Sequence, residues 1–154
     1  MLDDERHFCR PYNLFTPLQS SSSFSTISFR GACIHLYPDV KKVWLEALRS
    51  GHYVQGQEWL SQELDGERFF CCLGVLTELS RKYLRKNWKW ESQGYRKYGS
   101  LEGEDQTLHP LVQEWAGEGL GGNPKFPHLG TTLADLNDSG VDFESIADII
   151  EKEL

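Results

Sequence analysis

Apolar residues recur at helical spacing in four segments of this chain, which predicts four helices. The helices are expected at about residues 39–49, 72–84, 110–116 and 142–154, and a brief helical turn is expected at 133–136. Asp39 and Asp142 can cap the first and last helix, and Pro110 suits the first turn of the third.

Other segments alternate apolar and polar residues around turn-forming dipeptides. Asp65-Gly66 favours a tight two-residue hairpin turn, and Ser92-Gln93-Gly94 indicates a second turn. The expected strands are 59–64, 67–71, 87–91 and 95–98. The pattern therefore predicts a small α+β domain over residues 39–154, with about four helices and one or two short antiparallel hairpins.

Residues 1–38 lack either periodicity and contain the serine run Ser20–Ser23. We expect a flexible, Ser-rich N-terminal extension there. In the rest of the chain, the high aromatic content predicts a packed globular body. The N-terminus is acidic, and no apolar run reaches the length of a membrane helix, so we expect a cytoplasmic protein without a membrane partner.

Charge is distributed unevenly along the chain. The formal net charge is −7, yet residues 81–98 contain seven Lys and Arg residues and one acid. Aromatic residues are interleaved with these cations, and cations beside flat rings suit phosphates and bases. The candidate ligand-binding residues are Arg85, Trp88, Lys89, Trp90, Tyr95, Arg96, Lys97 and Tyr98.

A structural explanation of the same stretch remains open. Cations at 81–86 can offset the dipole at the end of the preceding helix, while the rings pack into the core. The acidic remainder of the chain argues against a long nucleic acid partner. A compact nucleotide-like anion, or an acidic patch on a host protein, fits the charge distribution better.

A second candidate pocket comprises polar residues at the end of the first helix and in two loops. Its members are Arg49, His52, Tyr53, Gln55, Asn137 and Asp138. These residues can instead cap the helix and hold the following hairpin.

No metal, cofactor or catalytic residue is predicted. The cysteines lack C-x-x-C spacing, and Cys71 and Cys72 sit in an apolar run typical of buried thiols. Residues 135–140 match the first half of a calcium loop, but Ile146 occupies the position of the closing Glu. The alternative of a small hydrolase or nucleotide-modifying enzyme would place its acids between Asp135 and Asp142.

Three sequence blocks, at residues 43–56, 70–76 and 133–149, resemble a family of small, mostly uncharacterised proteins encoded by phages and prophages. The blocks read WLEALRSGHYxQG from Trp44, FCCLGVL from Phe70, and LxxLNDxGxxFxxIAxxI from Leu133. The resemblance covers about residues 39–154, and members commonly have Cys-Asp where this chain has Thr77-Glu78. It implies an accessory protein in an infected or lysogenic bacterial cell, but no reaction and no catalytic residue.

These observations favour a non-enzymatic binding protein that acts on a host partner or a small anionic ligand, for example in counter-defence. The alternatives are the small enzyme described above and a nonspecific nucleic-acid-binding protein. No oligomeric state follows from the sequence.

Overall fold

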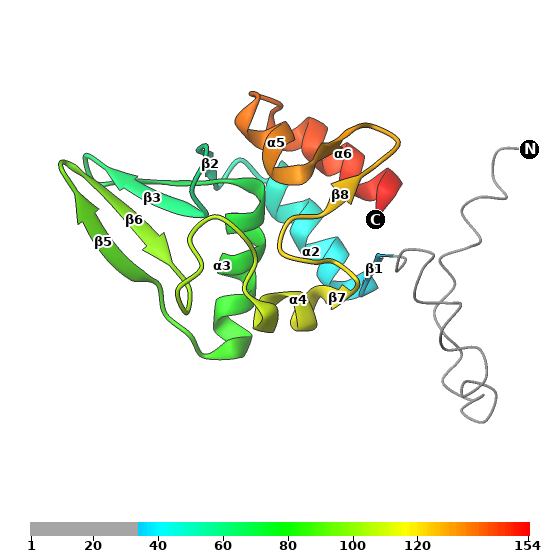
Figure 1. Ribbon diagram of the computed structural model, residues 1–154, viewed down its shortest axis with the longest axis horizontal. Coiled ribbons are helices and arrows are strands. Elements are labelled where there is room, and N and C mark those ends of the chain that lie inside the picture. Colours follow the sequence, from blue (N-terminus) through cyan, green and yellow to red (C-terminus); the bar gives the residue numbers. More distant parts are fainter. Residues whose placement is uncertain (1–33) are drawn as a thin grey trace, which may run out of the picture.

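A computed structural model describes residues 34–154, so most of the expected N-terminal extension lies outside the described residues (Figure 1). The described part is an α+β fold with five helices, a mixed five-stranded sheet and two small two-stranded sheets. The helices are α2 (Pro38–Arg49), α3 (Cys72–Leu84), α4 (Pro110–Ala116), α5 (Leu133–Asp138) and α6 (Phe143–Glu153).

The five-stranded sheet has the order β2-β4-β3-β6-β5. Its strands are β2 (Val54–Gln55), β3 (Ser61–Leu64), β4 (Glu67–Phe70), β5 (Lys89–Gln93) and β6 (Arg96–Ser100). Only β2 and β4 pair in parallel. The small sheets pair β1 (His35–Leu36) with β7 (Gly117–Glu118), and β8 (Lys125–Phe126) with β9 (Thr131–Thr132).

The prediction of about four helices with one or two separate hairpins was wrong, because the fold is richer in sheet. The two hairpins join through β3 and β6, where Ser61 lies opposite Gly99. Such pairing between distant segments leaves no local periodicity in the sequence. The remaining strands β1, β2, β7, β8 and β9 are only two residues long, which is too short for an alternating pattern to emerge.

Turn chemistry explains where the two hairpins reverse. Asp65 and Gly66 both have positive φ, at 53° and 80°, as the tight turn between β3 and β4 requires. The other hairpin reverses at Gly94-Tyr95, slightly later than expected, with Gly94 at φ 67°. Glycine at the first turn position therefore sets the register of β5 against β6.

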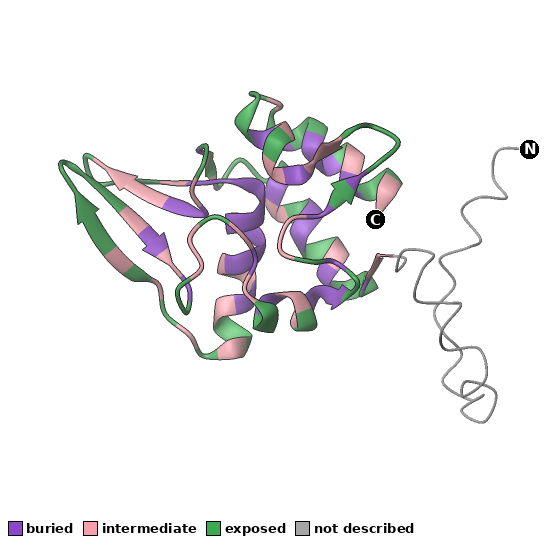
Figure 2. Ribbon diagram, viewed as in Figure 1, coloured by how far each residue is buried: buried purple, intermediate pink, exposed green. Residues whose placement is uncertain are grey.

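Helix α3 lies at the centre of the molecule, and the two long hairpins project from one side of the helical body (Figure 1). Burial is concentrated in the helices, whereas the far ends of the hairpins are exposed (Figure 2). Gly74 lets α3 approach the backbone of Leu60, because a Cβ at Gly74 would overlap the Leu60 carbonyl oxygen. Within residues 34–154, no helix has the length and apolar character to cross a membrane.

Candidate functional site

A groove of about 420 Å³ lies over the outer strands of the five-stranded sheet. Its lining residues are Trp59, Lys89, Glu91, Ser92, Gln93, Tyr98, Ser100, Gly103 and Asp105. The rings of Trp59 and Tyr98 pack against each other in a tilted arrangement, with centroids 4.0 Å apart and planes inclined by 35°. We call this concave surface the Trp59 groove.

Strand register places four of the groove's side chains on one face of the sheet. Glu91 lies opposite Tyr98, and Lys89 lies opposite Ser100, so these four side chains emerge on the same side of β5 and β6. Between β6 and α4, Leu101 and Glu104 form a short bridge around a turn with Gly103 at φ 92°. That turn brings Asp105 to the sheet and forms one wall of the groove.

The main chain holds this wall in place. The carbonyl oxygen of Asp105 accepts a 2.6 Å hydrogen bond from the backbone N–H of Leu60, directly after Trp59. Both sides of the groove are therefore tied together next to the two rings.

The Trp59 groove combines rings, amide and hydroxyl groups with few charges. Lys89 is its one cation, and Glu91 and Asp105 are its two carboxylates. A polyanion would meet net repulsion there, whereas a planar ligand with one anionic group could stack beside the rings and meet Lys89. The groove therefore suits a planar ligand with one negative group better than a polyanion.

The opposite face of the sheet contains the other two predicted indoles. Trp88 lies between Phe70 and Trp90, with ring centroids 6.4 and 6.2 Å away. An added Cβ at Gly99 would lie 3.1 Å from Trp88 and 3.2 Å from Trp90, so the indoles pack directly over this glycine. Trp90 is covered further by the Arg68 guanidinium, 4.7 Å from its ring centroid. These rings are part of the packing between sheet and helix.

A partly buried acidic side chain, that of Glu78, holds Trp88 in place. The indole N–H of Trp88 donates to the Glu78 carboxylate, which also accepts two hydrogen bonds from Arg81, at 3.1 and 3.2 Å. The ring of Tyr53 packs edge-on against Phe70, and burial together with the negative charge of Glu78 raises the pKa of Tyr53. Glu78 therefore links α3 to the start of β5.

The predicted cations are dispersed instead of converging on one site. Lys97 lies on the face opposite the groove and pairs with Glu63 at 3.6 Å. Arg96 lies over the exposed Tyr95 ring at 5.9 Å. Arg85 occupies the left-handed C-cap of α3 and is exposed. Of the eight candidates, only Lys89 and Tyr98 line the Trp59 groove.

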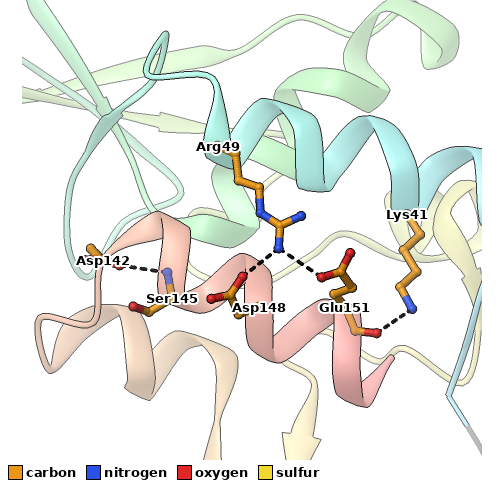
Figure 3. A network of polar contacts seen from close by, with 6 residues as sticks. All are labelled: Lys41, Arg49, Asp142, Ser145, Asp148 and Glu151. Atoms are coloured by element: carbon orange, nitrogen blue, oxygen red, sulfur yellow. Dashed lines mark hydrogen bonds and ion pairs between the residues drawn. The ribbon is translucent and has the colours of Figure 1, made fainter.

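In the second candidate set, Arg49 binds the last helix. Its guanidinium donates to Asp148 at 2.7 Å and to Glu151 at 3.1 Å, while Lys41 donates to the Glu151 carbonyl oxygen (Figure 3). The hydrogen bonds to these two carboxylates raise the pKa of Arg49. This contact joins α2 to α6. His52 is exposed, and its backbone N–H donates to Ser50.

Gln55 and Asn137, from the second candidate set, are hydrogen-bonded to each other. We call the hydrogen bonds of Gln55, Asn137 and Asp138 the clasp. Gln55 Nε2 donates to Asn137 Oδ1 at 3.0 Å and to the Val141 carbonyl oxygen at 2.7 Å. Asn137 is fully buried, and its Nδ2 donates to the Gly56 carbonyl oxygen. Asp138 Oδ1 accepts from the backbone N–H of Glu58 at 2.9 Å. The side chains satisfy one another and the nearby backbone, as a structural junction does.

The two described cysteines, Cys71 and Cys72, are buried in the core. Burial raises the pKa of Cys71 to about 12 and raises that of Cys72 as well. Cys71 Sγ accepts a hydrogen bond from the Gly74 N–H at the start of α3. Across residues 34–154, no group of three His, Cys, Asp or Glu side chains is placed to hold a metal ion.

Sequence reasoning proposed only two of the nine groove residues and missed Trp59, Glu91, Ser92, Gln93, Ser100, Gly103 and Asp105 as site residues. Trp59 was included only as part of an expected strand, and the loop after β6 was given no role. Asp105 lies 46 positions after Trp59, and no motif links the two. The only local signal is Glu102-Gly103, which favours a turn but does not indicate a ligand-binding site.

A comparison with known protein families identifies the family of this domain. The family described as Domain of unknown function (DUF8296) matches residues 36–154. The chain belongs to this family. The DUF8296 match runs from β1 to the C-terminal residue and includes the groove, the clasp and all five described helices. Searches of curated proteins and of solved structures found no match.

Proposed function

We propose that this DUF8296 protein is a non-enzymatic binding module, and that the Trp59 groove binds a small, nucleotide-like ligand. The tilted, closely packed rings of Trp59 and Tyr98 beside Lys89 are the observation that supports this proposal. A base can stack on the exposed side of the ring pair, and the Lys89 ammonium can meet one phosphate. Ser100 and Gln93 add hydrogen-bonding groups at the ligand's edge.

The biological setting that we propose follows from the sequence resemblance. The protein would act in the cytoplasm of an infected or lysogenic bacterial cell, as an accessory factor that sequesters a nucleotide signal in counter-defence. Stoichiometric capture needs an accessible surface and no catalytic group, which fits the groove. The mixed charges near Lys89 and Glu91 also favour a compact ligand over a long nucleic acid.

A host protein is a second candidate partner, supported by a different surface. Tyr83 is 70% exposed and stacks on Trp115 with ring centroids 5.5 Å apart. Lys82 and Arg85 flank it at the end of α3 and are exposed. An exposed ring pair beside cations suits an acidic patch on a partner, and Arg85 would contribute there instead of at the groove.

The enzyme alternative is less favoured, because two of its three candidate acids already have structural contacts. Asp138 binds the backbone of Glu58, and Asp142 Oδ1 caps α6 by accepting from the Ser145 N–H at 2.8 Å. Asp135, in the first turn of α5, is exposed. A capping carboxylate stabilises a helix end without taking part in chemistry.

Isothermal titration calorimetry with a panel of mononucleotides, each with a single phosphate group, tests the proposal. We expect at least one to bind stoichiometrically, and Trp59→Ala or Tyr98→Ala to weaken that binding about ten-fold or more, because stacking contributes about 1–3 kcal/mol per base. Tyr98→Phe keeps the ring and is the matched control. Equal affinity in Tyr98→Ala and wild type would overturn the groove assignment.

The same samples distinguish the alternatives. Chromatography after incubation should return the ligand unchanged; turnover that disappears in Asp138→Ala would establish the enzyme instead. A gel shift with short RNA or DNA should be weak. Affinity that falls by about one log unit per log of salt for each phosphate contacted would point to nonspecific nucleic-acid binding.

A further inference from the structure

Strand β5 is an open edge of the five-stranded sheet. It is last in the strand order, and β6 is the only strand of residues 34–154 that pairs with it. Its residues, KWESQ, contain no proline, and five consecutive pairs with β6 leave no bulge. Proline, bulges, covering segments and charged side chains, lysine above all, are the usual means of blocking a sheet edge. In the described part of the chain, β5 lacks the first three, and its one lysine, Lys89, is followed two positions later by Glu91.

The hairpin turn shows which backbone groups point outward. Gln93 and Arg96 face each other across the two-residue turn, so their backbone groups bond to one another. The direction alternates along the strand, and the N–H and C=O groups of Trp90 and Ser92 therefore point away from β6. Neither residue has a backbone hydrogen bond elsewhere in residues 34–154. Together they offer four unpaired groups to another strand.

The side chains of β5 are complementary to a second copy of the same strand. In an antiparallel pair centred on Trp90, Lys89 of each copy lies opposite Glu91 of the other. Both side chains are exposed, and neither has an ion-pair partner within residues 34–154. Opposite charges placed directly across two strands stabilise the pairing. The nearest registers that keep the same hydrogen-bonding pattern are shifted by two residues, and they would place Glu91 opposite Glu91 or Lys89 opposite Lys89, which is repulsive.

From these features we infer that the protein forms a symmetric dimer through β5, with Trp90 on the two-fold axis. The two sheets then join into one continuous sheet of ten strands, and both Trp59 grooves open on the same face. Each interface residue has the same role in both copies, as a two-fold interface requires. This inference does not depend on the proposed ligand, because it concerns backbone pairing and the Lys89–Glu91 contact.

A five-residue strand buries little area, so the dimer should be weak and dependent on concentration. Sedimentation velocity of the full chain over a wide concentration range should show a reversible monomer–dimer equilibrium. Glu91→Lys and Lys89→Glu should each abolish it by placing like charges opposite each other. The double variant, Lys89→Glu with Glu91→Lys, restores both ion pairs with reversed sign and should recover the dimer.

Glu114→Lys changes the net charge by the same amount as Glu91→Lys, at an exposed position of α4, and should leave the dimer intact. Amide exchange measured by NMR gives an independent readout. The N–H groups of Trp90 and Ser92 should become protected as concentration rises. A monomer at every concentration, a dimer that survives Glu91→Lys, or a double variant that stays monomeric would each overturn the inference.

Discussion

Asn137 joins α5 to the first turn of α3, because its buried Oδ1 accepts a 3.2 Å hydrogen bond from the backbone N–H of Cys72. The first N–H groups of a helix have no partner within that helix. Asn137 satisfies one of them and at the same time binds the loop after β2 through the Gly56 carbonyl oxygen. One amide therefore connects three separate segments of the fold.

Replacing this amide should destabilise the protein. Asn137→Ala leaves the Cys72 N–H and the Gly56 carbonyl without their partner in a buried site, so we expect a loss of about 3 kcal/mol in the free energy of unfolding. Urea denaturation followed by circular dichroism measures it. Ser139→Ala, which removes an exposed hydroxyl in the next turn, is the control and should cost much less. Similar losses for both variants would contradict the role of Asn137.

Gly74→Ala should be more damaging still. The new Cβ would lie 1.7 Å from the Leu60 carbonyl oxygen, so α3 must move away from β3. We expect a loss of about 4 kcal/mol or more, seen as unfolded or insoluble protein. Gly66→Asn is the comparison, because its position is open and Asn tolerates positive φ. A normally folded Gly74→Ala protein would show that the close approach is not required.

The buried thiols should resist alkylation in the native state. With the pKa of Cys71 raised to about 12, its thiolate is scarce at mildly alkaline pH, and burial also blocks the reagent. Peptide mass spectrometry after iodoacetamide treatment should find Cys71 and Cys72 unmodified until urea is added. Rapid modification of either cysteine in folded protein would contradict their placement in the core.

Asp142 should give the protein a component of acid sensitivity. The hydrogen bond from the Ser145 N–H lowers the pKa of Asp142 below its ordinary value. A lowered folded-state pKa stabilises the protein above the ordinary carboxyl pKa, and this stabilisation is lost as the pH falls through the folded-state value. Asp142→Asn keeps a capping side chain that does not titrate in this range. The melting temperature of wild type should exceed that of Asp142→Asn by a margin that shrinks as the pH is lowered. A difference that stays constant with pH would contradict the role of the Asp142 carboxylate.

The sequence predicted those features of the fold that depend on neighbouring residues. Capping by Asp142 was expected and is confirmed. The expected cap by Asp39 was wrong, because α2 already begins at Pro38 and its N-cap residue, Tyr37, makes no side-chain cap hydrogen bond. The sheet depends on Ser61 meeting Gly99, and α2 is held to α6 by Arg49 and Asp148, 99 positions apart. Nothing in the local sequence encodes these distant partners.

The candidate site shows the same division. Lys89 and Tyr98 were identified because cations and rings alternate in one stretch of sequence. Strand alternation places Lys97 on the face opposite the groove. Trp88 packs on that face too, where its indole N–H donates to Glu78. Trp59 joins the groove through β3–β6 pairing, which sequence periodicity does not predict.

NMR of the tryptophan indole N–H groups tests the central claim most directly. The five signals can be assigned with single Trp→Phe variants and followed as the nucleotide that binds in calorimetry is added. The Trp59 signal should shift with ligand concentration. The signals of Trp44, which is buried, and of Trp115, which stacks on Tyr83, should stay unchanged. A shift of Trp115 with no change at Trp59, or no shift at all, would contradict binding in the Trp59 groove.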